Sequence, residues 1–205
     1  GSHGDNGHVR GRRAAGADAP RCLDPVEAGH VEVHENEVEA APQREGDRLE
    51  AVLGLLHLHG ELAQGEARDL AQSQIAMAKE IKESMGPNDR PKLLLSGGEC
   101  TVTRRGEGVG GPNAEYTLAA AIELEDTAGI HVLACDTDGV DGAAEVAGAY
   151  CDHTTVNKAK GVGICAKEAL DDNDAHNFFA AVSDQIKTGP TFTNVNDFRA
   201  ILILP

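Results

Sequence analysis

Apolar residues recur at helical spacing along several stretches from about Gly65 onward. The first stretch, 65–86, carries Leu70, Ile75 and Ile81 on one side and ends at a Gly-Pro pair, which predicts a helix. Similar patterns predict further helices over 114–124, 162–174 and 175–189.

Three short runs are continuously apolar instead, and each is bounded by turn residues. They are KLLLS at 92–96, HVLAC at 131–135 and AILIL at 200–204. Runs of this length are typical of buried strands, and strands that alternate with helices predict an α/β domain. We therefore expect a layered, mainly parallel sheet with flanking helices.

The first 64 residues follow a different pattern. Residues 1–3 (Gly-Ser-His) have the sequence that a cleaved purification tag leaves, and residues 4–64 form an atypical segment rich in His, Glu, Ala and Gly. Its clearest helical face carries Leu49, Val52 and Leu53. The chain thus divides into 1–3, 4–64 and a domain at 65–205. We expect 47–64 to cover apolar surface of that domain, in its own chain or swapped into a neighbour in a homo-oligomer.

Charge and cysteine content narrow the functional classes. The formal net charge of −16 argues against nucleic-acid binding, because it repels a phosphate backbone. No apolar run reaches the roughly 18 residues that span a bilayer, so we expect no membrane partner and a cytoplasmic protein. The five cysteines form no CxxC pair, which predicts free thiols.

Glycines cluster in the stretch that joins the first predicted strand to the next helix. Gly97, Gly98, Gly110 and Gly111 leave backbone N–H groups uncovered by side chains, a geometry that suits phosphate or carboxylate oxygens. The alternative is that these glycines only form tight turns at the ends of strands.

Five ordered motifs carry a family resemblance: LLSGGECTVT, GVGGPNAEYTLAAAI, DTDGVDGAAEVAGA, DNDAHNFF and TGPTFTNVNDFRAIL. Over about residues 65–205 the chain resembles the carboxy-terminal MOFRL domain of class II glycerate 2-kinases, whose relatives include hydroxypyruvate reductases. The resemblance implies a second, larger α/β domain, an active site in the cleft between the two, and transfer of the ATP γ-phosphate to D-glycerate with a divalent cation. A chain of 205 residues cannot also contain that larger domain. The residues expected to bind phosphate or another small-molecule ligand are Ser96, Gly97, Gly98, Glu99, Gly110, Gly111, Asn113, Glu115, Thr193, Asn194 and Asn196.

The chain departs from the family pattern at two positions. Pro112 replaces the arginine of the common GGRNQE motif, and Phe192 stands where a glycine is usual. Phosphoryl transfer depends on positioned cations, so we expect the loss of this arginine to lower the rate of transfer by several orders of magnitude. We therefore expect a truncated glycerate 2-kinase-like domain without kinase activity of its own.

Two groups of residues are candidate metal ligands. Asp138 and Asp141 lie in an acidic turn that suits Mg²⁺, although turn formation and helix capping explain them equally. His30, His34, His57 and His59, together with Cys22 or Glu32, are candidate Zn²⁺ ligands. The alternative is that these histidines are exposed or locally satisfied, and no cofactor is certain.

An alternative function is promiscuous hydrolysis of esters or phosphate esters. Cys100 directly follows the first glycine turn, and Cys151 lies two residues before His153, which makes both thiols candidate nucleophiles. A metal held by the four histidines is the other route to hydrolysis, because bound Zn²⁺ activates water.

Overall fold

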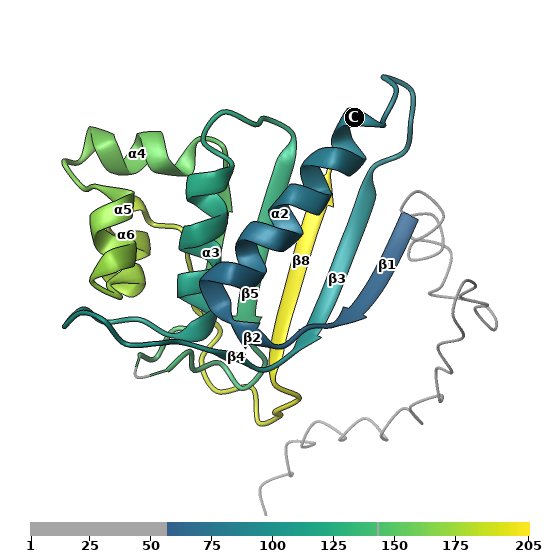
Figure 1. The fold of residues 1–205 in the computed structure, drawn as a ribbon. Coiled ribbons are helices and arrows are strands. Elements are labelled where there is room, and N and C mark those ends of the chain that lie inside the picture. Colours follow the sequence, from purple (N-terminus) through teal and green to yellow (C-terminus); the bar gives the residue numbers. More distant parts are fainter. Residues whose placement is uncertain (1–56, 143) are drawn as a thin grey trace, which may run out of the picture. The chain divides into compact units, whose positions relative to one another are not determined.

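The computed structural model describes residues 57–205 except residue 143, with side chains from residue 63 onward. Figure 1 shows helices α2 and α3 lying across one face of a sheet, with α4, α5 and α6 beside α3. The elements are β1 (His57–Leu62), β2 (Gly65–Glu66), α2 (Ala67–Glu83), β3 (Lys92–Gly98), β4 (Cys100–Thr101), α3 (Pro112–Glu123), β5 (Ile130–Asp136), β6 (Gly148–Asp152), α4 (Thr155–Gly161), α5 (Ala166–Asp171), α6 (Ala175–Val182), β7 (Gln185–Ile186) and β8 (Asp197–Ile203).

The main sheet has the strand order β1-β3-β8-β5-β6-β7. Only β1 and β3 are parallel neighbours in it, and every other described pair of this sheet is antiparallel. The α/β class and the three predicted strands are confirmed, but the expected mainly parallel pairing is wrong. The physical reason is that an apolar run reports burial and not direction. The last strand, β8, enters between β3 and β5 and separates two strands that would otherwise be parallel neighbours.

One face of the sheet carries buried side chains, and the side chains described on the other face are half-buried or exposed. On β8, Ile201 is 2% exposed and belongs to the row of side chains beneath the helices. The next residue, Leu202, points to the other face and is only half-buried, as are Leu93 and Leu133. The hydrophobic core therefore lies between the sheet and helices α2 and α3.

The predicted helices are confirmed in part. Helices α2 and α3 agree with their predictions, but the stretches 162–174 and 175–189 hold only the short helices α5 and α6. Helix α6 ends at Val182, and the next residue, Ser183, has a positive φ of 61° that stops the helix before β7. Helix α4 was not predicted, because its seven residues end at a glycine and resemble a loop.

The sheet also extends into the segment 4–64. Residues 57–62 form β1 and pair with β3, so they do not continue the helical face expected over 47–64. Residues 1–56 lie outside the described part of the chain. No described helix is long and apolar enough to cross a membrane.

Two neighbouring substitutions test the one-sided core. Ile201→Ala is expected to lower the free energy of unfolding by about 3 kcal/mol, because it empties a fully buried site. Leu202→Ala should cost about 1 kcal/mol, because that side chain already contacts water. Urea denaturation measures both. Equal losses would contradict the account, because they would mean that the second face is covered as completely as the first.

Candidate functional site

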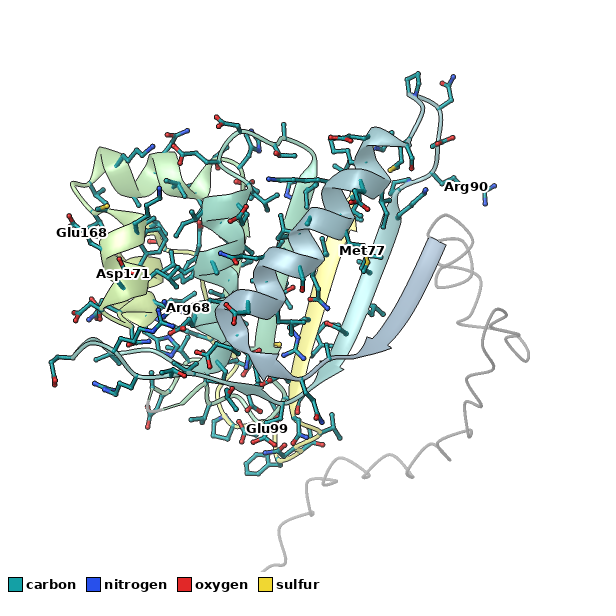
Figure 2. The ribbon with its side chains drawn as sticks, in the orientation of Figure 1. Arg68, Met77, Arg90, Glu99, Glu168 and Asp171 are labelled. Atoms are coloured by element: carbon teal, nitrogen blue, oxygen red, sulfur yellow. The ribbon has the colours of Figure 1, made fainter. Side chains whose placement is uncertain are left out.

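The family-like motifs meet at one end of the sheet. Because β8 runs antiparallel to β3 and β5, its first residue, Asp197, pairs with Gly98 at the end of β3 and with Asp136 at the end of β5. Figure 2 shows Glu99 at this end of the sheet. We call this region the loop edge, and it comprises residues 97–99, 105–114, 136–142 and 191–197.

A buried carboxylate caps helix α3 at the loop edge. Asp141 is fully buried, and its two oxygens accept hydrogen bonds from the backbone N–H groups of Asn113 (2.9 Å) and Ala114 (2.8 Å). Burial raises the pKa of Asp141, while these two hydrogen bonds oppose that rise. The amino-terminal N–H groups that would attract an outside anion are therefore already engaged by the protein itself.

The glycine-rich loop before α3 is closed in a similar way by the turn between α5 and α6. Asp172, Asn173 and Asp174 of this turn accept hydrogen bonds from five successive N–H groups of the loop. Asn173 Oδ1 accepts from the N–H groups of Arg105 (2.6 Å) and Gly106 (3.0 Å). Asp172 accepts from Glu107 through its Oδ1 (3.0 Å) and from Gly108 through its backbone carbonyl (2.9 Å). Asp174 Oδ1 accepts from Val109 (2.8 Å). These N–H groups therefore serve a close approach within the fold, which differs both from an open anion site and from a simple tight turn at the end of a strand.

The glycines of this loop have a steric reason as well. A Cβ on Gly106 would lie 2.2 Å from Asp172 Oδ1, and one on Gly108 would lie 2.4 Å from Asp174 Cβ. A Cβ on Gly111 would lie 2.5 Å from the Asp141 carboxyl group. These distances are too short for any side chain, so the loop needs glycine to reach its own acidic partners.

A second buried network holds the end of β3. Arg199 is 1% exposed and donates to Asp197 Oδ2 (3.0 Å) and to the carbonyl of Gly97 (3.0 Å). Asp197 also accepts from Asn113 Nδ2 (2.7 Å), which joins this network to helix α3. The Arg199 guanidinium also donates to the Ser96 hydroxyl and lies 5.7 Å from the centre of the Tyr116 ring.

Glu115 belongs to a third internal network. Its Oε1 accepts from Arg68 Nε at 2.8 Å, and its Oε2 accepts from Asn173 Nδ2 at 2.7 Å. Arg68 and Glu115 are both buried, so this ion pair is exposed to little solvent. Glu115 therefore links helices α2 and α3 to the turn between α5 and α6, which contains Asn173.

The exposed part of the loop edge consists of two hydrogen-bonded turns. Asn194 Nδ2 donates to Asp138 Oδ2 at 3.1 Å, and the Thr137 hydroxyl donates to the carbonyl of Asn196 at 2.9 Å. Thr193 lies in the same exposed turn, and Phe192 beside it is 98% exposed with φ of 59°. A non-glycine residue in this left-handed region costs about 1 kcal/mol, which is consistent with the usual glycine at this position.

The predicted metal ligands are not assembled in the described residues. No group of three or more His, Cys, Asp and Glu side chains there is placed to hold a metal ion. Asp141 is occupied as the α3 cap, whereas Asp138 lies in the exposed turn with Asn194. His57 and His59 lie in β1, opposite Lys92 and Leu94, but their side chains are outside the description. His30 and His34 fall outside the described residues altogether.

Neither predicted nucleophile has the surroundings of an activated thiol. Burial raises the pKa of Cys100 and raises that of Cys151 well above its usual value. The Cys100 Sγ lies 3.2 Å from Arg199 Nη1, but Arg199 is shared with Asp197. His153 Nδ1 is buried with no hydrogen-bond partner among the described residues, so no hydrogen bond joins it to Cys151. The two thiols are therefore held as protonated core residues.

Sequence analysis missed four residues that organise the site: Arg68, Asn173, His176 and Arg199. His176 Nε2 lies 2.9 Å from the Asp141 carbonyl and links α6 to the cap. The sequence did contain one indication of this network. Asp197 and Arg199 are charged residues at alternate positions of a strand that is otherwise apolar. Two charges on the buried face of a strand must be paired, which points to a network.

Cysteine alkylation tests the assignment of the thiols. Cys165 is exposed, and we expect iodoacetamide to modify it more than about tenfold faster than Cys100 or Cys151 in the native protein. Peptide mass spectrometry locates the modified thiols, and denaturant should equalise their rates. If Cys100 in the native protein reacts as fast as Cys165, the assignment of Cys100 as a protonated core residue is wrong and its thiol is again a candidate nucleophile.

A pair of glycine substitutions tests the closed loop. Gly111→Ala is expected to lower the free energy of unfolding by about 2 kcal/mol, because the new methyl group overlaps the Asp141 carboxyl. The matched control is Gly161→Ala at the end of α4, where no atom lies within 4 Å of the added Cβ. This control should be stabilised by about 0.5 kcal/mol. Thermal or urea unfolding measures both, and a neutral Gly111→Ala would contradict the tight approach.

The chain is similar in sequence to proteins of known family. The MOFRL family profile matches residues 92–197. The chain is 33% identical over 196 residues to the D-glycerate 2-kinase of Thermotoga maritima, an alignment that includes 94% of this chain and 45% of that protein. It is 39% identical over 146 residues to a putative hydroxypyruvate reductase of Agrobacterium vitis, with 70% of this chain and 33% of that protein aligned.

The fold agrees with these sequence matches. The crystal structure of glycerate kinase from Thermotoga maritima superposes with a TM-score of 0.71 at 34% identity, over 78% of this chain and 39% of that one. The chain thus spans less than half the length of these relatives. Because the family profile matches more than half of its 205 residues, the chain belongs to the MOFRL family.

Proposed function

We propose that this chain supplies the MOFRL half of a glycerate 2-kinase-type active site and does not transfer phosphate by itself. In this proposal the loop edge forms one polar wall of a cleft that receives a small hydroxy acid. The other wall, and the groups that neutralise the transferred phosphate, would come from outside the described residues. The names of its relatives in Thermotoga and Agrobacterium support this substrate class.

The observation that carries the proposal is the internal use of the loop edge's donors. Five N–H groups of the glycine loop and two of helix α3 bind the protein's own oxygens. An incoming phosphate would have to displace Asp141 or the turn at Asp172–Asp174, and the carboxylates there would repel it. The groups that stay accessible are Glu99 and the exposed turn around Asn194.

The cations of the described region support the same conclusion. Arg68 and Arg199 are buried and paired with carboxylates, and Pro112 occupies the first turn of α3. Arg104 and Arg105 are exposed, where water and salt screen their charge. Phosphoryl transfer relies on cations fixed close to the transferred group, so this arrangement lacks its main means of stabilising the transition state.

The family's divalent cation does not fit the described residues alone. Asp138 is half-buried and bonded to Asn194, Asp141 is a buried cap, and no third described ligand completes a group with them. We therefore assign no catalytic step to a metal on this chain. Hydrolysis by a cysteine likewise gains no support, because the surroundings of Cys100 and Cys151 raise the pKa of both thiols.

An ATP-coupled assay tests the proposal. The purified chain with ATP, Mg²⁺ and D-glycerate is expected to give no ADP above a blank without protein, because no cation of the described residues is fixed where it would stabilise the transition state. The Thermotoga maritima D-glycerate 2-kinase, run in parallel, shows that the assay detects turnover. Circular dichroism confirms that the tested chain is folded.

A control variant separates real activity from contamination. Asn194→Ala removes an exposed side chain of the loop edge and two hydrogen bonds, one donated to Asp138 and one accepted from the backbone N–H of Asn196. ADP formation that depends on D-glycerate, scales with protein concentration and falls in this variant would contradict the proposal. The same turnover in wild type and variant would indicate a contaminating kinase, and the chain itself would then stand as inactive.

A further inference from the structure

A pocket lies at the end of α3 that is remote from the loop edge. It has a volume of about 460 Å³ and is formed where α3 ends, α4 packs beside it and the chain turns into α5. Figure 1 shows α4 next to the end of α3 that is opposite β2 and β4. Since α3 has 12 residues, this pocket and the capped end of α3 are about 18 Å apart along the helix.

The walls of this pocket combine apolar and basic side chains. Ile122, Val156, Ile164 and Ala166 provide the apolar surface, and Val156 and Ala166 are buried. The charged residues of the lining are Glu125, Lys160 and Lys167.

Only one of these charges lacks a partner. Lys160 forms an ion pair with Glu125, so their charges largely cancel. Lys167 is exposed and forms no ion pair or hydrogen bond within the described residues. The lining thus carries one uncompensated positive charge, in a chain whose formal net charge is −16.

We propose that this pocket binds a small monocarboxylate with an apolar body, the class to which medium-chain fatty acids belong. The apolar walls would receive the hydrocarbon part, and the carboxylate would pair with the Lys167 ammonium group. A single free cation favours a monoanion over a phosphate dianion, which requires more donors than the lining offers. A volume of about 460 Å³ lies in the usual range for small-ligand sites and holds a body of this size.

The site does not rest on the proposed kinase-type function. It lies at the other end of α3, and none of its lining residues belongs to the loop edge. Its test is therefore a binding experiment, and either proposal can fail without the other.

Octanoate is the probe, and Cys165 in the pocket wall is the reporter. Because Cys165 is exposed and lines the pocket, bound octanoate should slow its alkylation by iodoacetamide. A ligand of ten heavy atoms with one exposed ion pair is expected to bind with a Kd of about 1 mM. Octanol, which has the same chain length and no charge, should protect Cys165 at least about fivefold less well, as expected for the loss of one surface ion pair.

Two variants locate the interaction. Lys167→Met keeps an apolar stem and removes the charge, so it should weaken octanoate binding about fivefold and leave octanol unchanged. Lys187→Met is the matched control, because Lys187 is exposed and does not line the pocket, and it should change nothing. Equal protection by octanoate and octanol, an unaffected Lys167→Met variant, or no protection of Cys165 would each overturn the proposal.

Discussion

The carboxylate of Asp141 is the contact on which the arrangement of the loop edge depends. It is fully buried, and both of its oxygens bind N–H groups in the first turn of α3. The backbone carbonyl of Asp141 lies 2.9 Å from His176 Nε2 of α6, so this one residue connects the loop after β5 to two helices. The absence of a side chain at Gly111 follows from this contact, because a methyl group there would overlap the carboxyl.

Glycine-rich loops before helices often hold phosphate, but here the protein's own side chains occupy the donors. Asp172, Asn173 and Asp174 act on the loop as an anion would, except that they are covalently part of the fold. This difference has an energetic consequence. An intramolecular carboxylate has no translational entropy to lose on binding, so an outside phosphate competes with it at a disadvantage. The donors of this loop therefore serve the stability of the fold.

The sequence allowed correct prediction of the class of fold and of the three central strands, because apolar runs such as 200–204 report burial directly. Strand direction could not be predicted, since nothing local to 197–203 indicates that this strand enters between β3 and β5. The fold brings the family-like motifs together at the loop edge, while the ligand-binding roles given to their residues stay predictions. Asp141 and Glu115 looked like ligands, and only the fold brings each of them to an internal partner more than 25 residues away in sequence.

Backbone-resolved NMR with added inorganic phosphate tests the central claim that the chain's own oxygens engage the donors of the loop edge. The amide signals of Glu107, Gly108 and Val109 and those of Asn113 and Ala114 report on the two closed sets of donors. The account predicts that these signals do not shift as phosphate is added, because each N–H already has a partner. Saturable shifts confined to these amides would contradict it, because they would show that phosphate displaces the internal carboxylates and finds an open anion site.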